Sequence, residues 1–556
     1  MKHTPSKKFK AAVEKAFHLP YWQLDERQTC DIELLINGAF APLTSFMSQA
    51  DYESVLNNMR LADGQLWPIP ITLSISENFA ESLKVGDQMT LRDAEHFAIA
   101  IIKIEEMWKP NLQEEAQKVF GTLDTKHPAV SYLFHSSNPV YISGPIQAIE
   151  LPKHIDYTKY RHTPKQLRAL FKQKKWEKII AFQTRNPMHR VHVEISKDAL
   201  KNKNTHLLIH PVVGITKPDD IDYHTRMKCY LTALKEYPKN STMLSLLPLA
   251  MRMAGPKEAL WHALIRKNYG CTHLIVGRDH AGPGKDSAGK DFYKPFEAHD
   301  LLTKYSDEIG IKPILFEEMA YSRSRKKYIF VKDKQAGEEL VSISGTQLRE
   351  MLKKGEELPE WFTMPAVAEH LKKVYPPLKK RGFTVFFTGL SGAGKTTLAK
   401  MLMVKLIAHG RRRVTLLDGD VVRTHLSSEL GFSKEHRSIN VQRIGYVASE
   451  ITKNGGIAIC APIAPYEADR MKNRNLISQY GVYIEIYLNT SLEVCEQRDI
   501  KGFYLRARHN LTPSFTGIND PYEVPKNAEI TLDTSVATAD ELTNEIYDRI
   551  KAMGCL

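Results

Sequence analysis

The sequence predicts a multidomain α/β protein, and three observations carry that prediction. The chain has 556 residues, which at about 150 residues per domain corresponds to three or four domains. Apolar residues make up 42% and charged residues 25%, close to the average of soluble globular chains. From residue 163 onward, apolar runs alternate with helical patterns, which is typical of βαβ units and a parallel sheet. This composition excludes collagenous, disordered and small disulfide-stapled proteins.

Charge and cysteine usage narrow the class further. The formal net charge is +13, a balance that suits nucleic acid, an anionic membrane or small polyanionic substrates. The basic residues are dispersed and no nucleic-acid motif accompanies them, so we expect neither nucleic acid nor a membrane as partner. The six cysteines are far apart with no C-x-x-C pair, which predicts reduced thiols and no zinc site. With no secretory signal and no apolar run of about 18–20 residues, we expect a cytoplasmic protein.

The first region, residues 1–162, predicts a β-rich domain. Turn signals interrupt its apolar stretches, which are ELLINGAFAPLTSF, QLWPIPITLSI, KVGDQMTLRD and EHFAIAIIKIEEMW. Short runs bounded by such signals favour strands with few long helices.

The second and third regions, residues 163–375 and 376–556, each predict a parallel sheet with crossover helices. In the second, strand-like runs (KIIAFQ, THLLIHPVVG, CTHLIVG, KPILFEEM) alternate with helical patterns such as PKEALWHALIRKNYG. The segment YPPLKKRG around Tyr375 combines prolines with basic residues and predicts a linker. Beyond it, FTVFFTG opens another strand–loop–helix series.

A phosphate-binding loop follows the predicted strand Phe383–Thr388. Its residues fit G-x-x-x-x-G-K-[ST]: Gly389, Leu390, Ser391, Gly392, Ala393, Gly394, Lys395 and Thr396. Glycines let backbone N–H groups close around phosphate oxygens at the N-terminus of the helix that follows. Lys395 would neutralise the β- and γ-phosphates, and the Thr396 hydroxyl would ligate Mg²⁺. We therefore expect ATP with Mg²⁺ here, and no other cofactor.

A pair of aspartates, Asp418 and Asp420, ends the predicted strand RRRVTLLDGD. Carboxylates at the carboxyl edge of a parallel strand can organise Mg²⁺ or accept a proton from an attacking hydroxyl. An ordinary acidic turn is the alternative, and the neighbouring phosphate loop favours the functional interpretation. Which aspartate plays which role stays open.

A second cluster of chemistry-bearing residues, QTRNPMHRVH, follows the predicted strand KIIAF. Two histidines three apart, His189 and His192, at the entry of a helix can donate to phosphate oxygens beside backbone amides. A metal site is another use of H-x-x-H, but no third ligand is evident nearby in the sequence. A merely structural histidine pair is the remaining alternative.

The third region resembles the adenylylsulfate (APS) kinase family from about Gly382 to Thr534. The resemblance rests on DGD followed by Arg423, and on LGFSKEHRSIN, API-APY, LEVCEQRDIKGFY and FTGINDPYEVP. It implies a P-loop kinase domain that binds APS through Arg423, Phe432, Arg437, Asn440, Ile463, Ala464, Lys501 and Phe515. Phe432 would stack on the adenine, and Lys501 and Phe515 would close the site. Ala464 replaces a serine found in many members, which excludes a phosphoserine route there and leaves direct in-line transfer.

The first two regions resemble the ATP sulfurylase (sulfate adenylyltransferase) family, of the H-x-G-H nucleotidyltransferase type, from about Leu24 to Phe362. The resemblance rests on QTRNPMHRVH, MRMAGPKEALWHALIRKNYGCTHLIVGRDHAGPG, SISGTQLREML, ELLINGAFAPLTSFM and DGQLWPIPITL. It implies a PUA-like first domain, then a Rossmann-like catalytic domain with a small appended helical piece.

This second resemblance also implies site residues. The implied catalytic residues are Thr184, Arg185, Asn186, His189 and His192. The implied substrate- and ATP-binding residues are Gln183, Gly277, Arg278, Asp279, His280, Ala281 and Met319. Gln183, Arg185 and the Ala281 backbone would hold sulfate, and the two histidines would polarise the α- and β-phosphates. Asn186, Gly277, Asp279 and His280 would seat the adenosine.

Together, the two resemblances predict a bifunctional enzyme of sulfate activation. It would transfer AMP from ATP to sulfate, giving APS and pyrophosphate, and then phosphorylate the APS 3′-hydroxyl, giving 3′-phospho-APS (PAPS) and ADP. The alternative is a sulfurylase whose third region is a non-catalytic, PAPS-binding allosteric module, as in fungal sulfurylases that have lost the phosphate loop. The intact loop favours the kinase. The expected partners are the small molecules ATP, sulfate and APS, and we expect the chain to form a homo-oligomer. The direction of the first reaction, assimilation of sulfate or formation of ATP, stays open.

Overall fold

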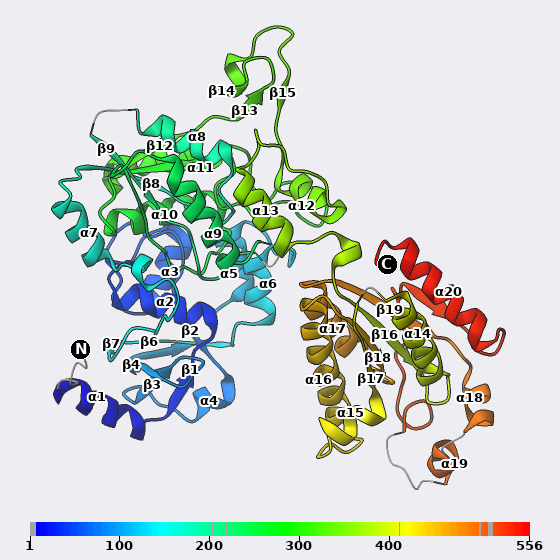
Figure 1. Ribbon diagram of the computed structural model, residues 1–556. Helices are drawn as coiled ribbons and strands as arrows, with labels where there is room; N and C mark the ends of the chain where they lie inside the picture. Colours follow the sequence, from blue (N-terminus) through cyan, green and yellow to red (C-terminus); the bar gives the residue numbers. More distant parts are fainter. Residues whose placement is uncertain (1–6, 202–203, 218–219, 411, 500–501, 510–514) are drawn as a thin grey trace. The chain divides into compact units, whose positions relative to one another are not determined.

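The computed structural model describes residues 7–201, 204–217, 220–410, 412–499, 502–509 and 515–556. The chain forms two compact units (Figure 1). The first unit comprises Met1–Ile343 with Pro359–His370, and the second comprises Ser344–Leu358 with Leu371–Leu556. Among the described residues, no helix combines the length and apolar character that crossing a membrane requires.

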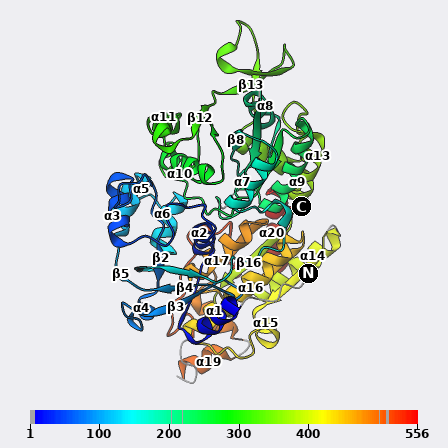
Figure 2. The ribbon, with the colours of Figure 1, turned by 90° about the vertical axis from the view of Figure 1, so that its left-hand side faces the viewer.

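The N-terminal part of the first unit contains two small sheets and six helices. One sheet has the order β1-β3-β4-β7 (Tyr21–Gln23, Gln88–Arg92, Ala98–Lys103, Ile146–Ala148) and the other β2-β6-β5 (Leu73–Ile75, Val140–Ser143, Glu106–Trp108). The helices are α1 (Lys7–His18), α2 (Glu26–Ile36), α3 (Gln49–Asn58), α4 (Glu77–Glu81), α5 (Leu112–Phe120) and α6 (Pro128–His135). Helices α3, α5 and α6 lie together beside β2 and β5 (Figure 2).

The strand predicted at the start of ELLINGAFAPLTSF is wrong, because this segment begins in helix α2. The Asp25 side chain caps the helix by accepting from the backbone N–H of Gln28 at 2.7 Å. In return, Oε1 of Gln28 accepts from the backbone N–H of Asp25. This reciprocal capping box is a helix signal that the apolar run concealed. Ile32, Leu34 and Leu35 are then buried in the core by the helix. The strands predicted in KVGDQMTLRD and EHFAIAIIKIEEMW are confirmed as β3, β4 and β5.

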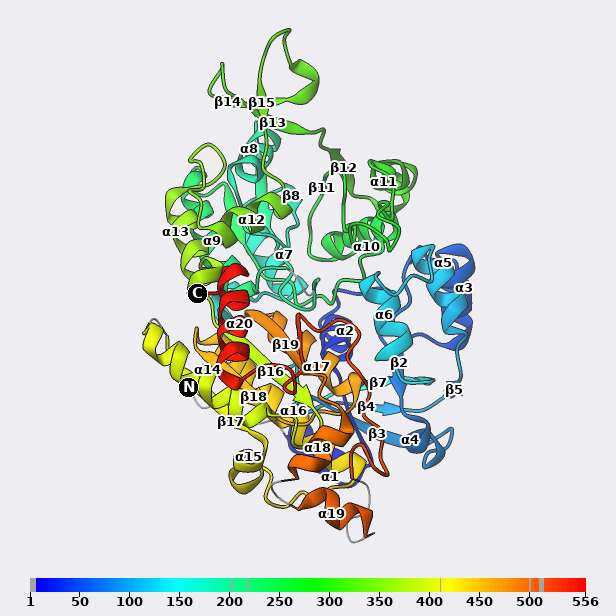
Figure 3. The ribbon, with the colours of Figure 1, turned by 90° about the vertical axis from the view of Figure 1, so that its right-hand side faces the viewer.

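The remainder of the first unit is built on a parallel sheet of order β10-β9-β8-β11-β12. Its strands are β8 (Lys178–Phe182), β9 (Thr205–Ile209), β10 (Thr242–Leu244), β11 (His273–Val276) and β12 (Lys312–Leu315). Its helices are α7 (Pro164–Gln173), α8 (Arg190–Ala199), α9 (Tyr223–Ala233), α10 (Gly255–Asn268) and α11 (Glu297–Ile309), of which α10 and α11 pack together near β11 and β12 (Figure 3). The strand order reverses between β8 and β11, and the loops after two such strands are where open α/β sheets commonly bind ligands.

Shorter elements complete the first unit. A three-stranded antiparallel sheet has the order β14-β13-β15 (Lys327–Phe330, Met319–Ser322, Leu340–Val341). Three 3₁₀ turns cover Thr158–Tyr160, Leu234–Glu236 and Val331–Asp333. Helix α13 (Pro365–Val374) belongs to the first unit up to His370 and to the second from Leu371.

The second unit is a parallel sheet between two layers of helices. The order is β17-β18-β16-β19-β20, with β16 (Phe383–Gly389), β17 (Val414–Asp418), β18 (Ile457–Ala461), β19 (Val482–Leu488) and β20 (Ile530–Leu532). Figure 1 shows these strands between α16 (Lys434–Lys453) with α17 (Glu467–Ser478) and α14 (Lys395–His409) with α20 (Ala539–Ala552). The other helices are α12 (Gly345–Lys354), α15 (Gly419–His425), α18 (Leu492–Arg498) and α19 (Phe503–Arg508), with a 3₁₀ turn at Leu378–Lys380. Every residue of the central strand β16 is buried.

All six cysteines are buried and free, in agreement with their spacing in the sequence. Burial raises the pKa of the Cys460 thiol well above its ordinary value, so the sulfur stays protonated and unreactive at neutral pH. The cysteines therefore contribute to packing.

Candidate active sites

The first candidate site lies where the loops after β8 and β11 meet. The loop after β8 carries Gln183 to His189, and the loop after β11 carries Gly277 to Gly282. The two loops are joined directly, because Nη2 of Arg185 donates to the carbonyl oxygen of Gly282 at 3.2 Å. The residues predicted from the two separate motifs therefore share one edge of the sheet.

His189 and His192 stand at the N-terminus of α8. Nδ1 of His192 accepts from the backbone N–H of His189 at 3.0 Å, so a neutral His192 carries its proton on Nε2. Burial lowers the pKa of His189 to about 3, with a smaller contribution from His192, and lowers the pKa of His192 to about 4. Both imidazoles are neutral at pH 7, and each has one N–H to donate beside the positive end of the helix.

Two residues absent from the sequence prediction hold His189 in place. The Phe362 ring stacks on His189 with centroids 4.4 Å apart, and Oγ1 of Thr363 lies 3.0 Å from His189 Nδ1. Both residues come from a segment about 170 positions later in the chain. No local motif marks them, so only the fold could reveal this support.

The other residues around the β8 loop differ in burial and in hydrogen bonding. The side chain of Gln183 is half-buried, and its Oε1 has no hydrogen-bond partner among the described residues. Ala281 is buried with a φ of 56°, which turns the β11 loop back at this point. The Thr184 hydroxyl, predicted to be catalytic, instead donates to the Asn186 carbonyl at 3.0 Å and shapes the loop. Asn186 itself is exposed.

The remaining predicted residues lie on the β11 side. Arg278 and Asp279 are exposed, Gly277 is half-buried, and Nη1 of Arg278 lies 3.4 Å from Glu318. Nε2 of His280 lies 3.0 Å from Nδ1 of His262, a fully buried residue of α10. Burial lowers the pKa of His280. Met319 begins β13, a strand of the separate antiparallel sheet that packs near α8.

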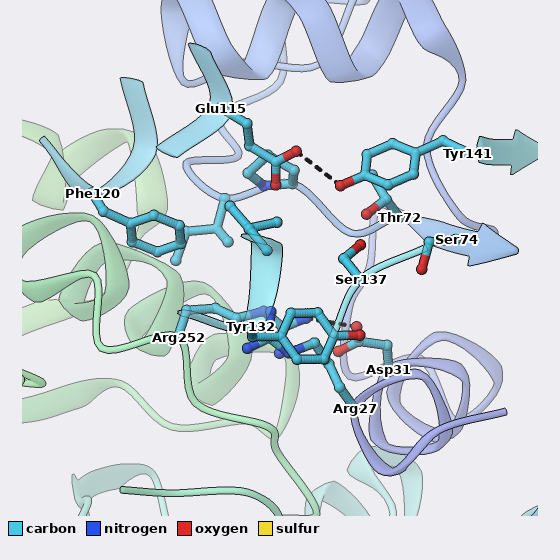
Figure 4. A pocket seen from close by; sticks show the side chains of 13 residues that line it. Arg27, Asp31, Thr72, Ser74, Glu115, Phe120, Tyr132, Ser137, Tyr141 and Arg252 are labelled. Atoms are coloured by element: carbon cyan, nitrogen blue, oxygen red, sulfur yellow. Dashed lines mark hydrogen bonds and ion pairs between the residues drawn. The ribbon is translucent and has the colours of Figure 1, made fainter. Parts of the chain in front are cut away.

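A buried ion pair anchors the loop that runs beneath this site. Nη2 of Arg252 donates to Asp31 at 2.6 Å, and the two side chains are 4% and 1% exposed. Figure 4 shows the pair beside Arg27 and Tyr132, in a polar cavity of about 20 Å³, a volume that suits one water molecule. The neighbouring residue Met251 lies with its sulfur 3.9 Å from Gln183. The N-terminal domain thereby supports the first site.

The second candidate site is a cleft of about 960 Å³ in the second unit. The predicted phosphate loop links β16 to α14 and lines it. Gly389 has a φ of 146°, and a Cβ there would lie 2.8 Å from the carbonyl oxygen of Leu488. Gly392, with a φ of 77°, would bring a Cβ to 3.0 Å from the Cys495 carbonyl oxygen. Glycine is therefore favoured at both positions, at Gly389 as the motif predicted and at Gly392 although the motif allows any residue there.

The loop's reactive side chains meet the aspartates of β17. Nζ of Lys395 donates to the loop carbonyls of Gly389 at 3.0 Å and Leu390 at 2.6 Å, and its side chain is buried. Oγ1 of Thr396 donates to Oδ2 of Asp418 at 2.7 Å. A hydroxyl beside a carboxylate next to a phosphate loop is the donor set that Mg²⁺ prefers when it binds with ATP. These residues therefore fit the predicted metal.

The far side of the cleft carries the residues predicted to bind a second nucleotide. The guanidinium of Arg423 lies 4.5 Å from the centre of the Phe432 ring, which is 63% exposed. Arg437 donates to Thr516, Tyr466 and Asp520 at 2.7, 2.8 and 2.5 Å. Its Nε, and Oδ1 of buried Asn440, have no partner among the described residues. These atoms are available to a polar ligand in the cleft.

The loop after β18 completes this side. Ile463 and Ala464 line the cleft, and their carbonyl oxygens accept from the Thr388 hydroxyl at 2.7 and 3.2 Å. Phe515 is half-buried and meets Tyr504 edge-on at 5.0 Å. Lys501 lies outside the described residues. Thr516, Tyr466 and Asp520 hold Arg437. They lie within the motifs API-APY and FTGINDPYEVP, but no signal in the sequence indicates that they pair with Arg437.

Three family models match successive parts of the chain. Family models match residues 2–151 (PUA-like domain), 158–374 (ATP-sulfurylase) and 381–533 (adenylylsulphate kinase). A protein named sulfate adenylyltransferase from Mycosarcoma maydis is 47% identical over 98% of this chain and 96% of its own length. One of the same name from Aspergillus oryzae is 47% identical over 97% of this chain and 95% of its own length.

A solved structure covers nearly the whole chain. It is described as a hexameric APS kinase from Thiobacillus denitrificans, is 35% identical, covers 99% of this chain and 97% of its own, and superposes with a TM-score of 0.77. The predicted order of a PUA-like domain, a nucleotidyltransferase domain and a P-loop kinase domain is confirmed. The chain therefore belongs to the sulfate adenylyltransferase family and carries an adenylylsulfate kinase domain behind its ATP-sulfurylase domain.

Proposed function

We propose that the chain performs two consecutive reactions of sulfate activation. In the first unit, a sulfate oxygen attacks the α-phosphorus of ATP, giving APS and pyrophosphate. In the second unit, the 3′-hydroxyl of APS attacks the γ-phosphorus of another ATP, giving PAPS and ADP. The observation that carries this proposal is the intact set of Lys395, Thr396 and Asp418 in a cleft that also offers unpartnered polar atoms for a second nucleotide.

The first reaction needs hydrogen-bond donors more than a general base. Sulfate is fully ionised at neutral pH, and its difficulty is repulsion from the phosphates of ATP. Donors aimed at the developing charge lower that barrier. Arg185, Gln183 and the Ala281 backbone would hold sulfate, while the neutral N–H groups of His189 and His192 would stabilise the pentavalent transition state and the departing pyrophosphate.

The nucleotide of the first reaction would lie along the β11 loop. Asn186, Gly277, Arg278, Asp279 and His280 are proposed to seat the adenosine, with Met319 at the margin. The exposed Arg278 and Asp279 are accessible to a ligand as they stand. No covalent intermediate is required.

The second reaction assigns different roles to the two aspartates. Oδ2 of Asp418 accepts from Thr396, and Oδ1 accepts from the backbone N–H of Asp420 at 3.0 Å. Oδ2 thus faces the phosphate-loop side, where Asp418 would orient the metal's water ligands, while Oδ1 caps α15. Asp420 is exposed and lines the cleft, so we assign it as the acceptor of the 3′-hydroxyl proton. Mg²⁺ bound with ATP supplies charge neutralisation at the β- and γ-phosphates.

Direct transfer between the two nucleotides is consistent with the β18 loop. Ala464 is 1% exposed and has no side-chain oxygen that could carry a phosphoryl group. The backbone of this loop would contact APS, and Phe432 and Phe515 would pack on its adenine.

The second reaction can also shift the unfavourable equilibrium of the first. The phosphate–sulfate anhydride of APS is energy-rich, so the first equilibrium lies towards ATP and sulfate. A kinase that consumes APS draws that equilibrium forward by mass action. The allosteric-module alternative is not favoured, because the loop, lysine and metal-type residues are all present.

A one-pot assay tests the proposal. The purified chain receives ATP, labelled sulfate and pyrophosphatase, and APS and PAPS are separated over time. PAPS is the expected product. Accumulation of APS without PAPS would favour a non-catalytic third domain.

We also propose that the chain forms a homo-oligomer, on the basis of the full-length structural relative described as hexameric. Sedimentation of the purified chain tests this assembly, and a monomer across micromolar concentrations would contradict it.

A further inference from the structure

Asp220 lies against the guanidinium of Arg185, in the loop that follows β9. Nη1 of Arg185 lies 2.8 Å from Oδ1 and 2.6 Å from Oδ2 of the carboxylate. The Asp220 side chain is 7% exposed and that of Arg185 is 18% exposed. Water therefore competes poorly for either group, and the pair is a fixed feature of the site.

Asp220 is itself held by its own loop and by a neighbouring one. Its Oδ2 accepts from the backbone N–H of Lys217 at 3.1 Å. The same loop is joined to the loop after β10, because the backbone N–H of Met251 donates to the Ile215 carbonyl at 2.9 Å. The carboxylate is thus held by the backbone of its own loop, and that loop is in turn tied to a neighbouring one.

The pairing leaves one edge of the guanidinium unused. Arginine has five N–H bonds, one on Nε and two on each Nη. Both oxygens of Asp220 accept from Nη1, and the Gly282 carbonyl accepts from Nη2. Among the described residues, Nε–H and one N–H of Nη2 have no hydrogen-bond partner. Nε and Nη2 form one edge of the guanidinium, and this is an edge with which arginine can bind two oxygens of an oxyanion.

We propose that Asp220 is a positioning residue of the sulfate subsite, which fixes Arg185 so that its Nε–Nη2 edge faces the incoming oxyanion. The inference rests on the proposed adenylylation of sulfate. Asp220 acts through Arg185 alone. Asp220→Asn keeps the size of the side chain but removes its charge and one acceptor oxygen. The KM for sulfate should rise about ten- to a hundredfold, the range for a weakened charge-assisted hydrogen bond, with kcat and the KM for ATP nearly unchanged.

The test measures sulfate-dependent pyrophosphate release by the full chain. A matched control is Asp156→Asn, which removes another Asp–Arg pair of the first unit, with Nη2 of Arg161 3.1 Å from the carboxylate. This control should leave the sulfate KM unchanged. Kinase activity on added APS reports in each variant that the second unit is intact, and thermal unfolding reports that the first unit is folded.

A double-mutant cycle with Arg185→Lys separates positioning from a general electrostatic effect. If Asp220 acts through Arg185, the double variant is no worse than Arg185→Lys alone. Additive losses, an unchanged sulfate KM in Asp220→Asn, or a lowered KM that reveals competition with sulfate would each overturn the inference. Should the Asn chain unfold, Asp220→Glu enters the same cycle with the same expected coupling. A wild-type chain without sulfate-dependent activity would instead refute the proposed function.

Discussion

The two candidate sites occupy the same position in their sheets but carry different side chains there. In each, a strand at the centre of a parallel sheet ends in a loop that opens a helix, α8 after β8 and α14 after β16. The residue before α8 is His189, whereas the residue before α14 is Gly394 with a φ of 94°. One site fills the helix N-terminus with buried neutral imidazoles, and the other opens it with glycines and places Lys395 beside it.

This difference follows from where charge develops in each proposed reaction. At the α-phosphorus, two anions must meet, and neutral donors with a single arginine can stabilise the transition state without trapping pyrophosphate. At the γ-phosphorus, charge spreads over the terminal oxygens, where a lysine and Mg²⁺ are effective. On the proposed mechanism, the first unit would use mainly neutral donors beside one arginine, and the second would use a lysine with Mg²⁺.

Both sites contain an arginine that is paired with an aspartate. Arg185 is paired with Asp220 at 2.6 Å and Arg437 with Asp520 at 2.5 Å. Both arginines are predicted to bind an anionic substrate, and both are held by a carboxylate from another loop. An arginine fixed in this way loses less side-chain entropy when the ligand arrives.

The largest expected effect isolates the second site. Lys395→Ala removes the cation beside the phosphate loop, so PAPS formation should fall by at least about 10³-fold, near the upper range for one transition-state donor. Pyrophosphate release from ATP and sulfate should persist. Paired assays of pyrophosphate and PAPS measure both, and loss of both activities would contradict independent sites.

The corresponding change in the first site removes a neutral donor. His192→Ala should lower kcat for adenylyl transfer by about 10²- to 10³-fold if, as proposed, Nε2–H donates to the charge that develops in the transition state. Kinase activity on supplied APS should be unaffected. An unchanged kcat for pyrophosphate release would refute the role of His192.

The dependence of the first site on the N-terminal domain can be tested through stability. Asp31→Ala leaves Arg252 buried without its partner, which should cost about 3–5 kcal/mol of unfolding free energy. Glu308→Ala, which breaks the exposed pair with Arg60, should cost less than about 1 kcal/mol. Heating should abolish sulfurylation before kinase activity in the Asp31 variant, and equal losses in the two variants would contradict the anchoring role.

The smallest effect concerns pH. Burial lowers the pKa values of His127 and His192 to about 4 and that of His189 to about 3. Between these values and about 6.5, the unfolded chain binds protons that the folded chain refuses, so stability falls as pH falls. Each histidine contributes up to about 1.4 kcal/mol per pH unit. Melting temperatures of the full chain at pH 7.5, 6.5 and 5.5 should fall in order, and His127→Gln should reduce the slope. A flat profile would contradict buried neutral histidines.

Much of this organisation was predictable from sequence because it is local. The strands KIIAF and FTVFFTG, the helices after them and the glycine pattern of the phosphate loop are encoded by short-range spacing. Helix α2 was missed because the apolar run ELLINGAF resembles a strand, whereas the capping box that marks the helix, Asp25 with Gln28, precedes that run. The supports of the sites were not predictable, since Asp220, Thr363 and Asp520 are brought to their arginine or histidine only by the fold. Long-range pairs of this kind have no sequence period.

Complementation between two inactivated chains tests the central claim most directly. Arg185→Ala should be unable to adenylylate sulfate, and Lys395→Ala should be unable to phosphorylate APS. With ATP, labelled sulfate and pyrophosphatase, neither chain alone should yield PAPS, and an equimolar mixture should restore it through APS released by the Lys395 variant. A mixture that still yields no PAPS, from chains that each retain the opposite activity, would contradict two independent nucleotide sites in one polypeptide.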